Sequence, residues 1–425
     1  MSAPRGDGFP GVRSPSGLVY VVWEITLRCD LSCAHCGSRA GRARPDELTT
    51  EEALRVVGEL AELGAEEITL IGGEAYLRPD FEELASAIAD AGMRCAMTSG
   101  GRAIDTERAR ALRRARVSQV SVSLDGLAHA HDVQRSLTGS FDAALQSMKC
   151  LADAGVEVSV NTQLNRWSFP DLDAVFALAH AHGAASWQVQ HTVPMGRAAE
   201  RPGWLFQPWE ILVVHPKLAE LAARGAAMER PMHLWPANNI GYFGPHEAQI
   251  RGRGVHRDRA WGGCIAGKHA LGLESDGTVK GCPSLPTATW AAGSTRTHRL
   301  ADLWEESRTL RRIRDRASEG GSDLWGRCKD CYYASVCRGG CTWTAEVFFG
   351  KHGNNPYCHH RASTLREQGL RERLIPQPPA PGVLAAPFDH RLFSLVEEPF
   401  RDDELFVAPP TSDFFPTPRR LPLAP

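Results

Sequence analysis

Hydrophobic and polar residues alternate along the first half of the chain in two recurring patterns. Short apolar runs rich in β-branched residues, such as YVVWEIT at 20–26, precede longer stretches whose apolar positions recur every three or four residues. The short runs are typical of buried strands, and the longer stretches of amphipathic helices. The predicted strands are 20–26, 67–71, 93–98, 117–124, 156–163 and 186–191, and the predicted helices are 50–63, 80–91, 105–115, 140–154 and 170–182.

Local signals at the ends of these segments support the division. Thr49 or Thr50 can cap the first helix and Gly64 can end it, while Pro79 and Asp80 open the second. Strands that alternate with helices pair in parallel through right-handed crossovers. The predicted fold class is therefore α/β, a partial (β/α)6 barrel of the TIM type. In such folds the loops that follow the strands carry the site.

The periodicity breaks after Gly196, and the second half of the chain is organised differently. The elements expected there are a helix over 204–224 with an interruption near Pro216, a hairpin of strands 271–274 and 278–281, and one helix over 300–316. The expected division is a flexible segment 1–17, a barrel core 18–230, a bridge 231–262, a cysteine-rich domain 263–372 and a Pro-rich tail 373–425. The tail is expected to be largely disordered, although its six phenylalanines leave open that parts of it dock on the body.

The composition narrows the classes of function. The chain has 425 residues, 43% of them hydrophobic, and a formal net charge of -2, which does not favour nucleic acid or an acidic membrane surface as a partner. It has no apolar run long enough for a transmembrane helix, and its N-terminus lacks the apolar core of an export signal. Twelve cysteines in such a chain favour metal binding or catalysis over disulfides, and a cytoplasmic location is expected.

Three cysteines directly follow the first predicted strand. Cys29, Cys33 and Cys36 are spaced closely enough to hold three corners of a cubane iron–sulfur cluster. The fourth iron would then lack a protein ligand and could bind a chelating amine and carboxylate, such as the methionine end of S-adenosylmethionine. Electron transfer onto that sulfonium gives a 5′-deoxyadenosyl radical. A zinc knuckle is the alternative, but zinc usually takes four protein ligands and only His35 is spare.

The CxxxCxxC pattern after the first strand, followed by Gly72-Gly73-Glu74 after the second, resembles the radical S-adenosylmethionine (radical SAM) superfamily. The resemblance implies a catalytic [4Fe–4S] cluster on the three cysteines and a GGE segment that contacts the amino group of bound S-adenosylmethionine. It also implies that Arg135 pairs with the methionine carboxylate and that Met195 lies near the adenine. Other residues that the resemblance places around the cofactor are Ser99, Ser123, Asp125, Asn161 and Gln190.

A second group of cysteines is similar to the seven-cysteine SPASM pattern found in many radical SAM enzymes. That resemblance implies two auxiliary [4Fe–4S] clusters. The implied ligands are Cys264, Cys282 and Cys341 for the first, and Cys328, Cys331, Cys337 and Cys358 for the second. Seven thiols cannot fill eight positions, so the first auxiliary cluster would have an open iron or a ligand other than cysteine. A zinc ribbon over 328–341 is the alternative, and Cys95 and Cys150 are expected to be buried apolar residues.

Relatives of this kind mostly modify peptides or proteins. In anaerobic sulfatase maturases, which make formylglycine, an Asp follows the cysteine that closes the first hairpin, whereas Pro283 and Ser284 follow Cys282 here. The expected function is therefore a peptide maturase that crosslinks or otherwise modifies a ribosomally made precursor. The maturases described as GDL-motif-associated are one subgroup that fits. Formylglycine formation, radical modification of a small molecule or cofactor, and a non-catalytic electron-transfer or scaffold role are the alternatives.

The expected partners follow from this chemistry. They are a precursor peptide or protein, an electron donor such as ferredoxin or flavodoxin, and a separate leader-recognition protein. Either the last of these or another surface of this chain is expected to hold the leader, because the segment before the first strand is too short for a leader-binding domain. The general base is left open, with His191, Glu274 and Asp276 as candidates.

Overall fold

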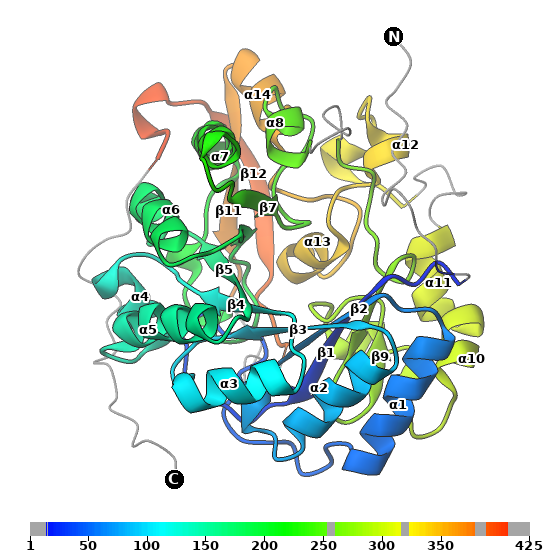
Figure 1. Cartoon of the computed structure of the whole chain (residues 1–425). Helices are drawn as coiled ribbons and strands as arrows, with labels where there is room; N and C mark the ends of the chain where they lie inside the picture. Colours follow the sequence, from blue (N-terminus) through cyan, green and yellow to red (C-terminus); the bar gives the residue numbers. More distant parts are fainter. Residues whose placement is uncertain (1–13, 15, 253–259, 316–322, 379–387, 407–425) are drawn as a thin grey trace.

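A run of parallel strands forms the centre of the protein (Figure 1). The computed structural model describes residues 14, 16–252, 260–315, 323–378 and 388–406. Strands β1 to β6 follow one another in sheet order, and each pairs in parallel with the next. Their bounds are β1 Tyr20–Thr26, β2 Glu67–Gly72, β3 Arg94–Ser99, β4 Gln119–Ser123, β5 Glu157–Leu164 and β6 Ser186–His191. The predicted partial (β/α)6 barrel is confirmed.

Helices on the outer face of this sheet connect successive strands (Figure 1). Their bounds are α1 Thr50–Glu62, α2 Phe81–Asp90, α3 Thr106–Arg114, α4 Ala128–Arg135, α5 Ser140–Asp153 and α6 Leu172–Ala181. Thr49 is the cap of α1, because its hydroxyl accepts the Glu52 N–H while the Glu52 carboxylate accepts the Thr49 N–H. The short helix α4 was not predicted, since its sequence AHAHDVQR has no apolar stripe of helical period.

The two faces of β1 divide the apolar core from the barrel interior. Val21, Trp23 and Ile25 are each at most 1% exposed and belong to the main apolar core. The intervening residues Val22 and Glu24 line an internal cavity instead. This period of two is what a strand dictates, and it places Glu24 inside the barrel.

The sheet extends beyond the six barrel strands on both sides. On one side β7, His233–Pro236, pairs in parallel with β6. On the other side β8, Ala270–Leu273, pairs in parallel with β1 and forms the predicted hairpin with β9, Thr278–Lys280. Strand β10, Gly293–Ser294, adds the last edge of a 10-stranded sheet. The cysteine-rich region therefore joins the barrel directly at its first strand.

Most of the remaining helices lie in the upper part and on the right of Figure 1. Their bounds are α7 Ile211–Ala227, α8 Glu247–Arg251, α9 Thr287–Trp290, α10 Leu300–Glu306, α11 Arg308–Asp315, α12 Ala334–Cys337, α13 Thr342–Phe349 and α14 His359–Glu367. No helix within the described residues is long and apolar enough to cross a membrane.

Two predictions about these helices were wrong. The single helix expected over 300–316 is broken at Ser307, which adopts extended backbone angles and directs its hydroxyl to the Ala292 carbonyl oxygen at 3.4 Å. The helix expected over 204–224 begins only at Ile211, after short 3-10 turns, and it continues through Pro216 without the expected interruption.

Part of the Pro-rich tail, residues 373–378 and 388–406, lies within the described residues and is structured. Strand β11, Leu370–Pro376, pairs antiparallel with β12, Phe393–Pro399. Arg371 and Arg373 both bond the Glu398 carboxylate across this pair. Residues 388–406 thus dock on the body. Phe414 and Phe415 lie outside the described residues, as do residues 1–13 and 15 of the expected flexible segment 1–17.

Candidate active site and cofactor sites

The loop between β1 and α1 presents Cys29, Cys33 and Cys36 to one cavity of about 430 Å³. Two backbone hydrogen bonds hold this loop in place. Cys29 N–H donates to the Gly41 carbonyl oxygen at 3.0 Å, and Ala34 N–H donates to the carbonyl of α4 residue Gln134 at 2.7 Å. The three thiols are thereby held at the carboxyl ends of the strands, where the barrel fold places a site.

The turn that follows β6 holds the same loop from the other side. Arg197 Nε donates to the Cys33 carbonyl oxygen at 2.6 Å. Gly196 has a φ of +58°, and a Cβ there would collide with the carbonyl oxygens of Cys36 and Gly37. A glycine is therefore required where this turn meets the cysteine loop.

Gly72 and Gly73 have a packing role beside the cofactor role that the resemblance implies. A Cβ on Gly72 would collide with the Thr26 carbonyl oxygen, and a Cβ on Gly73 with that of Arg28. The two glycines let the end of β2 lie against the chain that leads into the cysteine loop. Both also line the cavity.

Glu74 presents a carboxylate at the edge of the cysteine loop. Its oxygens accept Ser99 Oγ at 2.7 Å and Gly100 N–H at 2.6 Å. Burial raises the Glu74 pKa to about 7. One carboxylate oxygen of Glu74, one of Asp30 and the Cys29 thiol lie within 4.8 Å of one another. This corner suits a group that brings a metal and a positively charged amine together.

Other expected cofactor contacts lie on the cavity wall. They are Ser99, Ser123, Asn161, Gln190 and Met195. Asn161 Oδ1 is buried and accepts no hydrogen bond within the described residues. Because an unpaired buried oxygen costs about 1–3 kcal/mol, a donor on a ligand would satisfy it. This open oxygen, the three thiols and Glu74 fit a cubane cluster with S-adenosylmethionine.

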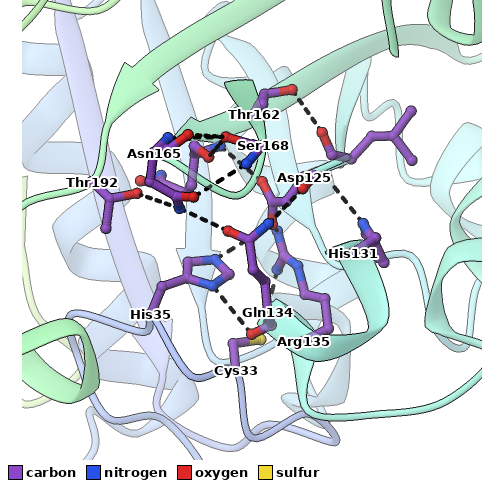
Figure 2. A network of polar contacts seen from close by, with 12 residues as sticks. Cys33, His35, Asp125, His131, Gln134, Arg135, Thr162, Asn165, Ser168 and Thr192 are labelled. Carbon is purple, nitrogen blue, oxygen red and sulfur yellow. Dashed lines mark hydrogen bonds and ion pairs between the residues drawn. The ribbon is translucent and has the colours of Figure 1, made fainter. Parts of the chain in front are cut away.

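Asp125 and Arg135 pair with each other at the end of β4 (Figure 2). Arg135 Nη2 lies 2.5 Å from Asp125 Oδ2, and Nη1 lies 3.7 Å from Cys33 Sγ. His35 Nε2 lies 3.4 Å from the same Asp125 oxygen. Burial opposes the charged form of Asp125, but Arg135 and the neighbouring histidines outweigh it and hold its pKa below the usual range. In the structure Arg135 joins β4 to the cysteine loop, and its pairing with a methionine carboxylate remains a proposal.

A layer of amides and hydroxyls supports this ion pair from behind (Figure 2). Gln134 Nε2 donates to the Asp125 carbonyl oxygen at 2.6 Å. Asn165 Nδ2 in turn donates to Gln134 Oε1 at 2.7 Å and lies 3.1 Å from Thr192 Oγ1. The network links α4 with the ends of β5 and β6, so it fixes the position of Asp125 behind the cavity.

Asp125→Asn should therefore destabilise the protein strongly. The change leaves Arg135 buried without its carboxylate partner, and breaking such a pair costs about 3–5 kcal/mol. The expected result is a lower midpoint in anaerobic urea denaturation. Asp142→Asn, on an accessible turn of α5, serves as control. An unchanged midpoint for Asp125→Asn would show that the pair adds nothing to stability.

The first auxiliary group of cysteines opens on the same cavity as the cysteine loop. Cys264, Cys282 and Cys341 all line it. Burial raises the pKa of Cys341 to about 12, and the thiols of Cys264 and Cys282 lie near enough to contribute. One cavity thus receives thiols from the barrel and from the cysteine-rich domain.

The second auxiliary group gathers separately. Burial raises the Cys358 pKa to about 12, and the thiols of Cys328 and Cys331 add to the effect. Burial also raises the pKa of Cys337, with Cys358 and Cys328 contributing. The structure thus brings together the two sets of thiols that the sequence implied. Cys95 and Cys150 are buried in β3 and α5 as expected.

A tail segment that sequence reasoning did not assign to the site also borders the cavity. Phe388 lines it, and its backbone N–H donates to the Gly37 carbonyl oxygen at 3.1 Å. Its ring lies 3.9 Å from Lys280 Nζ. The next residues form backbone hydrogen bonds with Pro194 and Gly196, on either side of Met195. The only sequence signal was the cluster of phenylalanines in a Pro-rich tail.

Phe388→Ala should loosen this segment. The substitution removes a side chain that is only 8% exposed, together with its contact to Lys280, and should lower the free energy of unfolding by about 3 kcal/mol. Anaerobic chemical denaturation measures the change. Phe400→Ala, which lies in the same tail away from the cavity, is the matched control and should cost less.

The three candidates for a general base are placed differently. Glu274 lines the cavity, but both of its oxygens are paired, one with Lys280 at 2.6 Å and the other with Arg44 at 3.2 Å. His191 is fully buried among aromatic rings. Asp276 accepts a backbone N–H in the hairpin turn. None of the three offers a free basic atom to the cavity.

A partial barrel whose first loop presents three thiols to a cavity, which the cysteine-rich domain also lines, is typical of an iron–sulfur enzyme. The model of the Radical SAM superfamily matches residues 23–166, and that of SPASM, an iron–sulfur cluster-binding domain, matches residues 264–332. An AdoMet-dependent heme synthase of Methanosarcina barkeri is 30% identical over 351 residues, 80% of this chain and 96% of the relative. The chain belongs to the radical SAM superfamily and carries a SPASM domain.

Other similar proteins include a peptide-bound one among the solved structures. The mycofactocin maturase MftC of Mycobacterium tuberculosis is 28% identical over 369 residues, 85% of this chain and 88% of the relative. Streptococcus suis SuiB, solved with its precursor peptide SuiA, matches with a TM-score of 0.60 at 15% identity, over 81% of this chain and 75% of SuiB. At that identity the likeness shows a common fold alone.

Proposed function

We propose that this radical SAM/SPASM enzyme is a maturase that modifies a ribosomally made peptide. The observation that carries the proposal is the single cavity lined both by Cys29, Cys33 and Cys36 and by three auxiliary cysteines. Bound S-adenosylmethionine supplies a 5′-deoxyadenosyl radical when it is reduced. A peptide carbon held in this cavity would lose its hydrogen beside a site able to accept an electron.

The approach to this cavity supports an extended substrate. A second cavity, of about 800 Å³, shares wall residues with the first, among them Tyr20, Thr98 and Gln188. It opens at the amino ends of the barrel strands, near Val19 and Glu66. The side chains that the second cavity adds include Gln119, Ser121, Ser159 and Ser186, together with charged groups such as Glu67, Arg94 and Glu157. Uncharged hydroxyl and amide groups of this kind can bond the backbone of a peptide.

A tetrapyrrole is the second candidate substrate, because the M. barkeri relative is named a heme synthase and matches over 96% of its length. A coproporphyrin carries several carboxylates and would need free cations. The arginines that line the first cavity are Arg135 and Arg197. Arg135 pairs with Asp125, and Arg197 bonds backbone carbonyls of the cysteine loop. This wall favours the peptide over the tetrapyrrole.

The remaining assignments belong to the same proposal. The cluster ligands are the ten cysteines that the sequence implies, in the three groups described above. Electrons come from a ferredoxin or flavodoxin, and a separate protein recognises the leader of the precursor. Formylglycine formation is less favoured, because Pro283 and Ser284 occupy the place where sulfatase maturases have an Asp.

Anaerobic reconstitution tests the proposal. The enzyme is mixed with dithionite, S-adenosylmethionine and a candidate precursor peptide, chosen from any short open reading frames beside its gene. Chromatography measures 5′-deoxyadenosine and mass spectrometry measures the peptide. The expected result is 5′-deoxyadenosine together with a peptide of changed mass. Consumption of Fe-coproporphyrin III with an unchanged peptide would reverse the choice of substrate.

A further inference from the structure

Glu24 is the one acidic residue of β1, whose sequence is YVVWEIT. Its side chain points into the barrel and lines the cavity that receives the radical-site and auxiliary thiols. The residue is 3% exposed. Burying a carboxylate costs free energy unless it is hydrogen-bonded or ion-paired. The groups around Glu24 therefore indicate its role.

Glu24 belongs to a buried cluster of two acids and two bases. Arg44 Nη2 lies 2.8 Å from Glu24 Oε1 and 3.2 Å from Glu274 Oε2. Lys280 Nζ lies 2.6 Å from Glu274 Oε1, which also accepts the Thr287 hydroxyl. Glu274 is therefore bonded through both oxygens. Within the described residues, Glu24 accepts a hydrogen bond through Oε1 alone.

Three carboxylic acids line the cavity, and they differ in whether both carboxylate oxygens have hydrogen-bond or ion-pair partners. They are Glu24, Glu74 and Glu274. Both oxygens of Glu74 are bonded by Ser99 and Gly100, and both oxygens of Glu274 are bonded as described. Among these three carboxylates, Oε2 of Glu24 is the one oxygen with no hydrogen-bond partner in the described part of the chain. Glu24 and Cys282 line the same cavity, and no acid follows Cys282 in the sequence.

We propose that Glu24 is the general base that takes the proton released when the substrate radical is oxidised. The inference rests on the proposed radical chemistry in this cavity. The 5′-deoxyadenosyl radical takes one hydrogen atom from a substrate carbon. When that carbon bonds to a neighbouring S, O, N or C atom that carries a hydrogen, Glu24 Oε2 takes the proton from that atom. The auxiliary cluster that Cys264, Cys282 and Cys341 would hold would accept the one electron released.

The electrostatic surroundings suit this role. Burial raises the pKa of Glu24 to about 7, against the opposing effect of Arg44. Glu274 adds to the rise and Lys280 opposes it, so groups from the cysteine loop, β9 and the hairpin turn all act on Glu24. A base is most effective when its pKa lies near the working pH. Product formation should accordingly increase as the pH rises through about 7, because the carboxylate is the active form.

Glu24→Gln and Glu24→Asp test the inference, with Glu51→Gln on the exposed first turn of α1 as matched control. Gln can still accept from Arg44 but cannot take a proton. Glu24→Gln should still form 5′-deoxyadenosine, while its yield of modified peptide per 5′-deoxyadenosine falls about 10²-fold or more. Asp should restore part of the yield. Iron content and circular dichroism check that each variant folds.

The outcomes separate this inference from the substrate proposal. A Glu24→Gln enzyme that modifies the peptide at the wild-type yield overturns the role of Glu24. A wild-type enzyme that forms 5′-deoxyadenosine but leaves the peptide unchanged overturns the peptide proposal instead. Infrared pH titration then decides on Glu24. Glu74, whose pKa is also about 7, contributes a protonated-carboxyl band in both enzymes. A band lost near pH 7 that is smaller in Glu24→Gln than in the wild type supports the inference, and identical spectra overturn it.

Discussion

Cys33→Ala should reduce the formation of 5′-deoxyadenosine to background. Cys33 is 7% exposed and lies between Arg135 and the carbonyl-bonded backbone of its loop, so no other thiol of the described chain can replace it without moving that loop. A cubane cluster that loses one of three ligands is not retained. Iron analysis after anaerobic reconstitution should show about eight irons per chain in place of about twelve.

Cys150→Ala is the matched control for that experiment. Cys150 is equally buried, at 6% exposed, but it lies on α5 and away from the cavity. It should keep both the iron and the cleavage activity. If Cys33→Ala still cleaved S-adenosylmethionine, the catalytic cluster would have to be assigned to another group of cysteines.

The barrel was predictable because its signals are local. Each strand is a short apolar run, and the helix ends carry residues such as Thr49 and Gly64 whose conformations require few partners. Strand β6 has the predicted bounds, Ser186–His191. Parallel pairing then brings the loops after the strands to one side, which is why Cys29, Glu74 and Gly100 border one cavity.

Contacts between distant segments were not predictable in the same way. Arg135 could be assigned to a ligand from sequence, but only the fold shows that Asp125 lies 2.5 Å away. Phe388 lines the cavity, and its backbone N–H donates a hydrogen bond to the carbonyl oxygen of Gly37, more than three hundred residues earlier in the chain. Glu24 did leave a signal, a single acid at an inward position of an apolar strand, and the alternation of β1 would have found it.

Cys282→Ala should separate radical formation from product formation. Cys282 lies in the auxiliary group that shares the cavity with the cysteine loop, so its loss should remove about four irons while the catalytic cluster keeps its own three ligands. The variant should still form 5′-deoxyadenosine. Modified peptide should fall to background, because the substrate radical would have no nearby acceptor for its electron.

Cys358→Ala is the matched control for Cys282→Ala. Cys358 belongs to the second auxiliary group, which does not line the cavity. If the two variants lose the same amount of iron but only Cys282→Ala loses the product outright, the electron leaves through the group nearest the substrate. Unaltered product formation in Cys282→Ala would mean that this group is structural. The base at Glu24 would then have to work with a different electron acceptor.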